Sequence, residues 1–278
     1  MTPSDFARKN VFLFGGSLGI GLAIAKRLAA LGSDITIFAR RPEPLARAEE
    51  AVRERRQSVE QRVSSRPLDV ADRAQVTAVL AAAVAEDGVP DVLINCAGRA
   101  YPKRFEDISY EEFADTMRVN LHGCWNTVSL LAPHMKANGG GYIVNTASVA
   151  GLIGVFGYTD YCASKFALVG FSEALRSELK PHGITVSVLC PPDTDTPGFA
   201  IENQTKPPET KAVSAPAKIM TPEMVADALI RGMARRPLLI IPGIESRVAV
   251  LAKRLLPGVV EWAMDRSIRK VQQRRDAR

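Results

Sequence analysis

The chain has 278 residues, 46% of them hydrophobic and 24% charged, which is ordinary for a globular protein. It is long enough to bury a substantial core without stabilising disulfides or metals. This length allows one large domain or two small ones. The net charge of +6 is concentrated near Arg53–Arg62 and from Lys253 to Arg278, and it suits phosphates, nucleic acid or anionic membranes without choosing among them.

Apolar runs of strand length alternate with longer helical patterns along the chain. The expected strands lie at Val11–Phe14, Asp34–Phe38, Val63–Leu68, Val92–Asn95, Gly141–Thr146 and Ile184–Leu189. The expected helices lie at Ile20–Leu31, Pro44–Gln61, Arg73–Glu86, Tyr110–Lys136 and Asp160–Lys180. This alternation predicts an α/β fold of the Rossmann type, a doubly wound parallel sheet with helices on both faces.

Local signals mark several boundaries. Ser109 and Glu112 have the spacing of a capping box, Thr221-Pro222-Glu223 predicts a helix start, and Pro181 with Gly183 predicts a helix end. Pro191–Pro222 lacks apolar periodicity, and we expect a long loop there that covers a substrate. We therefore expect a catalytic domain over residues 1–244 and a basic C-terminal tail over residues 245–278.

The first expected strand leads into a glycine turn, Gly15 to Gly21 (GGSLGIG), and then directly into a helix. Such a turn lets the backbone approach a pyrophosphate, whose charge the helix N-terminus favours. The strand–turn–helix setting predicts a dinucleotide site, against the alternative of a tight turn that binds nothing.

The end of the second expected strand favours NADPH over NADH. An NAD enzyme normally places an acidic residue there, whereas this chain has Ala39 followed by Arg40 and Arg41. A guanidinium suits a ribose 2′-phosphate, and Ser17 in the glycine turn can donate to the same group. A solvated arginine pair is the alternative.

Tyr161 and Lys165 lie four residues apart on one face of an expected helix. A nearby cation favours a phenolate, so we expect Lys165 to lower the pKa of Tyr161 towards working pH and to make it a proton donor and acceptor. Ser148 follows the fifth strand on the side where open sheets bind ligands, and its hydroxyl can hold a substrate oxygen beside the phenol.

From Val11 to about Thr196 these motifs resemble the short-chain dehydrogenases/reductases. The resemblance implies that Ser148 orients a carbonyl, Tyr161 protonates it, Lys165 binds the nicotinamide ribose and tunes Tyr161, and Asn120 fixes a water in a proton relay. It also implies that Asn95 lines the adenine-ribose side of the cofactor. The positions implied for the cofactor are Gly15, Ser17, Gly19, Ile20, Gly21, Arg40, Asp69, Val70, Asn95, Ala97, Gly98, Tyr161, Lys165, Pro191, Thr194 and Thr196.

Two positions depart from the family pattern. Phe14 stands where the family usually has a threonine before the glycine turn, and Pro192 stands where a glycine usually follows Pro191. The first change removes side-chain hydrogen bonds that stabilise the turn, and the second removes a backbone donor near the nicotinamide.

The segment from Pro191 to Thr210 resembles one branch of this family, the 3-ketodihydrosphingosine reductases, as do Asn95–Gly98, Phe105–Asp107 and Gly154–Gly157. The resemblance implies NADPH-dependent reduction of 3-ketosphinganine to sphinganine. Another hydrophobic ketone, such as a steroid or 3-oxoacyl compound, is the alternative among enzymes. A nucleotide-sensing scaffold or a membrane-surface protein is the alternative outside enzymes.

The remaining signals concern partners and location. Arg247–Leu256 and Val259–Val271 are basic amphipathic patterns, so we expect peripheral membrane contact at most, against packing on the domain. The charged stretch Arg47–Arg62 lacks interleaved aromatic residues, and we expect no nucleic-acid partner. The family resemblance implies a homo-oligomer, a dimer or tetramer formed through the fourth and fifth long helices.

The cysteines and histidines show no ligand pattern. No C-x-x-C pair occurs, Met1–Asn10 is polar, and no apolar run reaches the ~18 residues of a membrane span. We therefore expect reduced thiols, no metal and a cytoplasmic enzyme, at a membrane surface if the tail binds one. The residues concerned are Cys96, Cys124, Cys162, Cys190, His122, His134 and His182.

Overall fold

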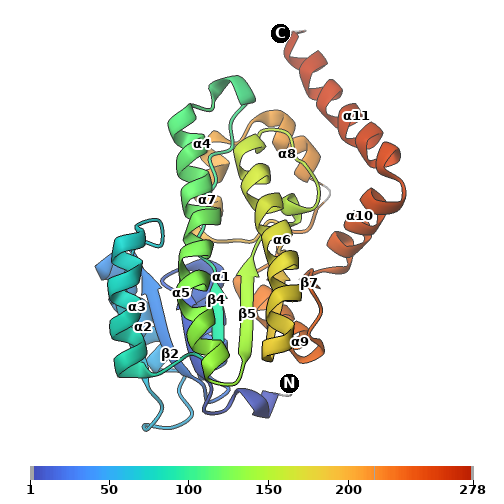
Figure 1. The fold of residues 1–278 in the computed structure, drawn as a ribbon. Coiled ribbons are helices and arrows are strands. Elements are labelled where there is room, and N and C mark those ends of the chain that lie inside the picture. Colours follow the sequence, from blue (N-terminus) through green and yellow to red (C-terminus); the bar gives the residue numbers. More distant parts are fainter. Residues whose placement is uncertain (1–2, 216, 277–278) are drawn as a thin grey trace.

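The computed structural model describes residues 3–215 and 217–276, and within them seven strands form one parallel sheet (Figure 1). The strand order is β3-β2-β1-β4-β5-β6-β7. The strands are β1 (Asn10–Phe14), β2 (Asp34–Ala39), β3 (Val63–Pro67), β4 (Val92–Asn95), β5 (Gly141–Thr146), β6 (Ile184–Leu189) and β7 (Leu239–Ile240). The order reverses between β1 and β4, which confirms the predicted Rossmann-type sheet with its ligand crevice at that reversal.

Helices cover both faces of the sheet. The helices are α1 (Gly19–Ala29), α2 (Pro42–Arg53), α3 (Arg73–Asp87), α4 (Tyr110–Met117), α5 (Gly123–Ala137), α6 (Thr159–Leu179), α7 (Pro197–Thr205), α8 (Pro208–Ser214), α9 (Pro222–Arg235), α10 (Ile244–Leu255) and α11 (Pro257–Asp276). One apolar cluster joins α1, α2 and α9 to the sheet, and a second joins α3, α5 and α6 to its other face. The two clusters hold the carboxyl ends of the strands at one fixed edge.

All six predicted strands are present, and the helix boundaries read from side-chain caps are confirmed. The Ser109 hydroxyl accepts from the backbone N–H of Glu112 at 3.1 Å, and the Glu112 carboxylate accepts from the N–H of Ser109 at 3.1 Å. Thr221 caps α9, and Gly183 adopts a left-handed conformation with φ of 72° after α6. Short-range signals therefore determine these ends.

Two predicted helices differ from the structure, and one strand was not predicted. The helix expected to reach Gln61 ends at Arg53, because the buried Gln61 side chain donates to Ala29 O at 2.8 Å and draws the chain back to α1. The helix expected over Tyr110–Lys136 is interrupted by a π-helical turn at Arg118–His122. β7 has only two residues, too few to show a strand pattern.

The segment expected as a loop, residues 191–222, contains α7 and α8. Thr196 starts α7 by accepting from the backbone N–H of Phe199 at 3.0 Å, and Pro197 fills the first helical position. Pro208 likewise fills the first helical position of α8, but α8 has no side-chain cap. Both helices are shorter than ten residues, so apolar periodicity gives little warning of them.

The C-terminal helices extend along one side of the molecule. α11 packs against α8 and α10, and both C-terminal helices border the cavity described below. In Figure 1 they rise beyond the sheet as a separate arm. The division of the chain at residue 244 stays a prediction.

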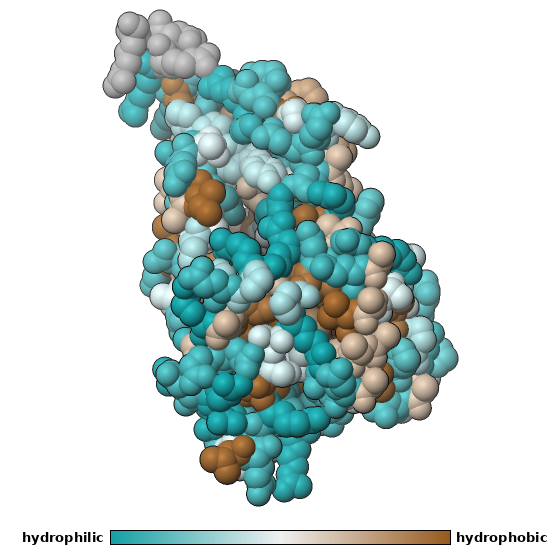
Figure 2. All heavy atoms as spheres, turned by 90° about the vertical axis from the view of Figure 1, so that its left-hand side faces the viewer, coloured by the Kyte–Doolittle hydropathy of each residue, from teal (hydrophilic) through white to brown (hydrophobic). Residues whose placement is uncertain are grey.

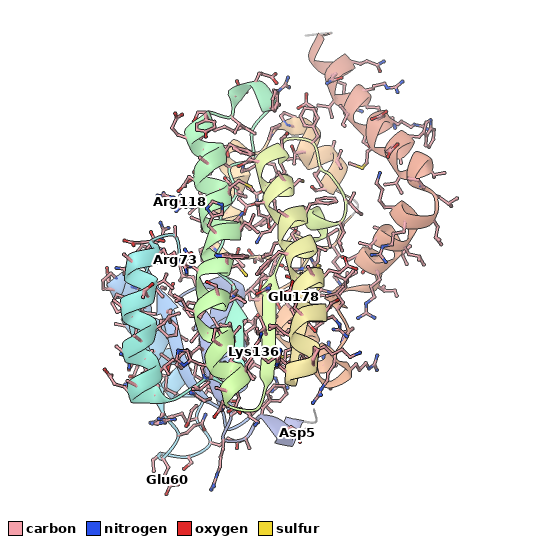
Figure 3. All side chains as sticks on the ribbon, viewed as in Figure 1. Asp5, Glu60, Arg73, Arg118, Lys136 and Glu178 are labelled. Atoms are coloured by element: carbon pink, nitrogen blue, oxygen red, sulfur yellow. The ribbon has the colours of Figure 1, made fainter. Side chains whose placement is uncertain are left out.

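Charged side chains lie on the outer faces of α5 and α6. Lys136 on α5 and Glu178 on α6 point outwards into solvent (Figure 3). The face shown in Figure 2 is mostly hydrophilic, with small separated apolar areas. Among the described residues, no helix is both long enough and apolar enough to cross a membrane.

Candidate active site

A cavity of about 1390 Å³ lies at the carboxyl ends of β1, β4, β5 and β6. It runs from the glycine turn before α1, past α6 and α7, to the inner sides of α10 and α11. Pockets for one small molecule usually measure ~300–1,000 Å³. This cavity therefore has room for a dinucleotide and a second, elongated molecule.

The glycine turn has the close contacts that a dinucleotide site requires. Gly15 has φ of +82° and its N–H donates to Phe38 O at 2.8 Å. A Cβ on Gly21 would lie 2.2 Å from Gly15 O, so only glycine allows the turn to meet the helix this closely. Leu18 precedes α1 without a side-chain cap and no acid lies in the first turn, which leaves backbone N–H groups for an anion.

The departure at Phe14 does not open the turn. The Phe14 ring stacks on Phe38, with ring centroids 4.5 Å apart. The N–H groups of Gly15 and Gly16 both donate to Phe38 O, so backbone hydrogen bonds hold the turn where the family uses a threonine side chain.

Arg40 leaves the end of β2 and lines the cavity with a half-exposed side chain. Its guanidinium lies 3.9 Å from Asp69 Oδ2, a long contact that leaves most of its donors free. Asp69 is itself fixed, because its Oδ1 accepts from the N–H of Ala71 at 2.9 Å. The end of β2 therefore presents a cation to the cavity and no acid.

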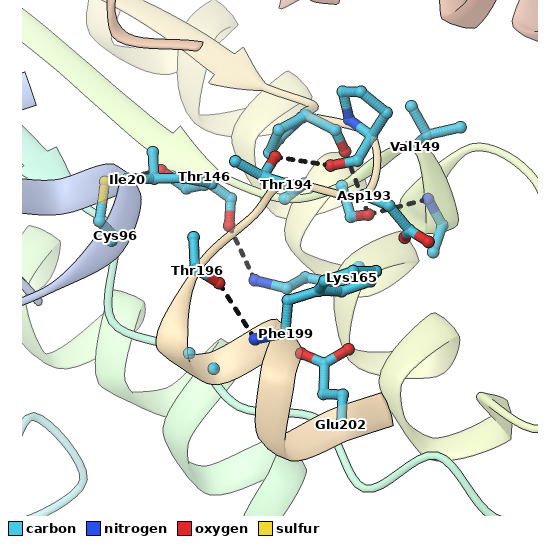
Figure 4. Close-up of a pocket in the computed structure, with 18 of the residues that line it drawn as sticks. Ile20, Cys96, Thr146, Val149, Lys165, Asp193, Thr194, Thr196, Phe199 and Glu202 are labelled. Atoms are coloured by element: carbon cyan, nitrogen blue, oxygen red, sulfur yellow. Dashed lines mark hydrogen bonds between the residues drawn. The ribbon is translucent and has the colours of Figure 1, made fainter. Parts of the chain in front are cut away.

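Tyr161, Lys165 and Ser148 meet at the centre of the cavity wall. Tyr161 and Lys165 lie on one face of α6, with Lys165 Nζ 5.5 Å from the centroid of the phenol ring. Lys165 Nζ also donates to Thr146 O at 2.8 Å (Figure 4). Ser148 Oγ accepts from the N–H of Ala150 at 3.1 Å, which fixes the hydroxyl beside the end of β5.

The pKa of Tyr161 is raised in the structure, contrary to the lowering expected from Lys165. Burial raises the pKa of Tyr161 above its ordinary value, the charge of Glu202 raises it further, and a hydrogen bond with Ser148 opposes both. Burial lowers the pKa of Lys165 to about 8. Spacing on a helix predicts that two groups are neighbours, but it does not show that both are withdrawn from water.

The structure separates the predicted residues into those at the cavity wall and those behind it. Asn120 lies behind the wall, where its amide accepts from Arg99 N and donates to Arg99 O and Ser164 Oγ, each at 2.9 Å. It therefore holds the loop after β4 against α6. The predicted residues that line the cavity are Gly15, Ser17, Gly19, Ile20, Gly21, Arg40, Asp69, Val70, Ala97, Gly98, Ser148, Tyr161, Lys165, Pro191, Thr194 and Thr196.

The expectation that Asn95 lines the cofactor site is wrong. Its side chain is buried, donates to Asn145 Oδ1 at 2.9 Å and accepts from Thr127 Oγ1 at 2.8 Å. These bonds tie β4 to β5 and α5 below the cavity floor. The position just after the strand, at Ala97 and Gly98, forms the wall instead.

Four residues of the site were missed by the sequence analysis. Tyr158 donates from its hydroxyl to Glu202 Oε2 at 2.9 Å, and Lys206 Nζ lies 3.5 Å from Asp193 Oδ2. Glu202 and Lys206 belong to α7 and its C-terminal cap. The signal that could have found them is the spacing of Phe199, Glu202 and Lys206, which is that of one helix face.

Sequence comparisons agree with this geometry. Residues 9–207 match the model of the short chain dehydrogenase family. A 3-dehydrosphinganine reductase of Danio rerio is 42% identical over 230 residues, which cover 82% of this chain and 69% of that protein. A 3-ketodihydrosphingosine reductase of Bos taurus is 40% identical over the same shares of the two chains.

Solved structures share the fold and differ in the cofactor bound. Levodione reductase matches with a TM-score of 0.78 at 25% identity, covering 87% of this chain and 99% of that one. L-Sorbose reductase from Gluconobacter frateurii, complexed with NADPH and L-sorbose, has a TM-score of 0.74 at 25% identity, covering 84% and 95%. A short chain dehydrogenase from Mycobacterium paratuberculosis, bound to NAD, matches with a TM-score of 0.75 at 27% identity. The match covers 85% of this chain and 97% of that one.

Proposed function

Because the chain belongs to the short-chain dehydrogenase/reductase family, we propose that it uses NADPH to reduce 3-ketosphinganine to sphinganine. The observation that carries this proposal is the meeting of Ser148, Tyr161 and Lys165 in one cavity, between a glycine turn and a long apolar wall. An oxidoreductase acting on a C=O or CH–OH group needs these groups together.

The residues present fit a nicotinamide dinucleotide. The turn from Gly15 to Gly21 and the N-terminus of α1 suit the pyrophosphate, and Ala97, Gly98, Thr194 and Thr196 suit the remaining length of the molecule. Arg40 and Ser17 favour a ribose 2′-phosphate, and therefore NADPH. When bound, this cofactor supplies the hydride that the carbonyl carbon receives.

The chain's own residues hold the carbonyl and supply its proton. The Ser148 hydroxyl donates to the carbonyl oxygen and fixes its position. Tyr161 gives its phenolic proton to that oxygen as the C=O bond becomes C–OH, so the product is the alcohol. Lys165 holds the ribose and supplies positive charge near the phenol, while Asn120 keeps the neighbouring loop and α6 in register.

The far half of the cavity suits the alkyl chain of a sphingoid base. Its walls there come from α8, α9, α10 and α11 and are mainly apolar. The side chains concerned are Val213, Met220, Met224, Val248, Ala249, Val260 and Met264. Burying an alkyl chain against such a wall stabilises its binding by about 25 cal/mol for each Å² of apolar surface removed from water.

The direct test is NADPH consumption with 3-ketosphinganine, a steroid ketone and a 3-oxoacyl compound, with the product identified by mass spectrometry. We expect the highest kcat/KM with 3-ketosphinganine and sphinganine as the product. Faster turnover of the 3-oxoacyl or steroid ketone would assign the enzyme to another hydrophobic substrate. Absence of turnover with all three would favour a scaffold.

We also propose that the tail contacts an anionic membrane surface from the cytoplasmic side. Leu251, Leu255 and Trp262 are exposed apolar side chains, and Arg254 and Arg266 lie near them. Flotation with anionic liposomes should carry the wild type but not the double variant Leu251→Gln and Leu255→Gln. Equal flotation of the two proteins would reject this contact. Neither Leu251 nor Leu255 lines the cavity, so the double variant leaves the cavity wall unchanged.

A homo-oligomer is a further proposal. Tyr110 and Phe113 on α4, Trp125 on α5 and Phe166 on α6 are large apolar side chains exposed on one side of the sheet. Sedimentation should give a dimer or tetramer for the wild type, and Phe166→Glu should shift it towards monomer. A monomeric wild type would exclude this assembly.

A further inference from the structure

A cluster of charged side chains lies in the cavity beside Tyr161, and the proposed reaction leaves it without a role. Asp193 follows β6, Glu202 lies on α7, and Lys206 caps the C-terminus of α7. All but Lys206 line the cavity; Lys206 is buried beneath it, with its Nζ 4.3 Å from the Phe199 ring centroid. Figure 4 shows Glu202 and Asp193 around the same hollow as Lys165.

The two acids of the cluster differ in their ion pairs. Lys206 pairs with Asp193, at 3.5 Å between Nζ and Oδ2. Among the side chains that the structure describes, no Lys, Arg or His nitrogen forms an ion pair with the Glu202 carboxylate. One of its oxygens accepts from the Tyr158 hydroxyl, which is neutral. The Glu202 carboxylate therefore faces the cavity without an ion pair of its own, and the charges of Lys206 and Lys165 act on it only from a greater distance.

This charge lies close to the reacting group. The rings of Tyr158 and Tyr161 are 5.5 Å apart between centroids, so Glu202 is one side chain removed from the phenol of Tyr161. In keeping with this proximity, the charge of Glu202 raises the pKa of Tyr161. The pKa of Glu202 is itself raised, mainly because its carboxyl group is buried. A partly buried carboxylate without a cation is costly unless a ligand supplies one.

We propose that Glu202, supported by Asp193, forms a binding site for the ammonium group of the substrate. The inference rests on the proposed function, because 3-ketosphinganine carries an amine on the carbon next to its ketone. A carbonyl held between Ser148 and Tyr161 would place the amine nitrogen two bonds from the carbonyl carbon, in the cavity that Tyr158 and Glu202 also line. An α-amine titrates near pH ~8, and a carboxylate partner favours its charged form.

The site distinguishes amino ketones from other long-chain ketones. An apolar wall accepts any long chain and discriminates weakly between them. A carboxylate that needs a cation rejects the analogue without an amine, because the charge then stays unpaired. Glu202 therefore supplies the specificity that the apolar half of the cavity lacks.

The test compares Glu202→Gln with the wild type on two ketones, 3-ketosphinganine and the deaminated analogue 1-hydroxyoctadecan-3-one. Glutamine keeps the shape and the bond from Tyr158 but removes the charge. We expect kcat/KM for the amino ketone to fall about tenfold to a hundredfold, mainly through KM, the range for a hydrogen bond to a charged group. The value for the deaminated ketone should not fall, and it should rise to the extent that the unpaired charge of Glu202 disfavours that ketone. Glu178→Gln, an exposed acid on α6 outside the cavity, is the matched control and should leave both values unchanged.

A binding measurement separates this inference from the proposed function. Calorimetry with short-chain sphinganine and its deaminated diol should show an amine preference in the wild type that Glu202→Gln loses. If the wild type reduces no ketone but keeps this preference, the reaction is wrong and the ammonium site stands. If Glu202→Gln lowers kcat/KM equally for both ketones, or changes neither, the ammonium site is overturned.

Discussion

The two halves of the cavity are built in different ways. The cofactor half uses backbone groups at the ends of β1 and β4 and at the start of α1, which neighbouring residues in the chain position. The substrate half uses side chains from α7, α8, α10 and α11, which only tertiary packing brings together. The cofactor half therefore follows from a local sequence pattern, whereas the substrate half depends on side chains that are particular to this chain.

The strongest way to separate the halves is to remove the phenolic proton at their junction. Tyr161→Phe should lower kcat by about 10²–10⁴-fold, the usual contribution of a positioned proton donor. NADPH binding, followed by cofactor fluorescence, should change little, because the glycine turn and Arg40 are untouched. A variant that retains full turnover would contradict the role of Tyr161, and one that loses cofactor binding would indicate a structural defect.

The cofactor half is tested at Arg40. Arg40→Asp should weaken NADPH binding by about tenfold to a hundredfold and weaken NADH binding far less, because the lost contacts are charge-assisted bonds to one phosphate. Arg41→Asp is the matched control, at the N-terminal boundary of α2, and should have a smaller effect. Equal weakening of both cofactors by Arg40→Asp would reject the assignment to NADPH.

The sequence predicted the cofactor half well and the substrate half poorly, for physical reasons. A glycine turn between strand and helix is a local pattern, so the order of residues alone places Gly15, Gly19 and Gly21. It does not place Glu202, because α7 is short and begins with a proline, and the contact with Tyr158 joins residues 44 positions apart. Asn95 was expected to line the cavity but is buried below its floor, because a strand pattern does not determine which residue at the strand's end reaches the cavity.

The pKa of Lys165 gives a pH test at the junction. Burial lowers this pKa from 10.5 to about 8, so between those values the unfolded chain binds more protons than the folded one at this site. Stability then rises with pH through that window. Cys96, Cys124 and Cys190 have raised pKa values and act in the opposite sense.

The contribution of Lys165 is therefore measured as a difference. Subtracting the unfolding free energy of Lys165→Met from that of the wild type at each pH removes most of the cysteine contribution. The difference should become more favourable to the wild type as pH rises from 8 to 10.5. A flat or falling difference would show that Lys165 is not withdrawn from water.

The smallest expected effect lies at Thr196, where α7 begins above the cavity. Its hydroxyl accepts from the N–H of Phe199 at 3.0 Å, and losing such a cap costs about 1 kcal/mol. Thr196→Ala should fray α7, displace Glu202 and raise KM for the ketone by about fivefold, while Thr196→Ser keeps the cap and should resemble the wild type. Because the Thr196 methyl also lies near Gly19, NADPH affinity is measured on both variants. If alanine and serine behave alike, or if only NADPH affinity falls, then α7 is held by packing alone and the substrate half is more rigid than its short helices indicate.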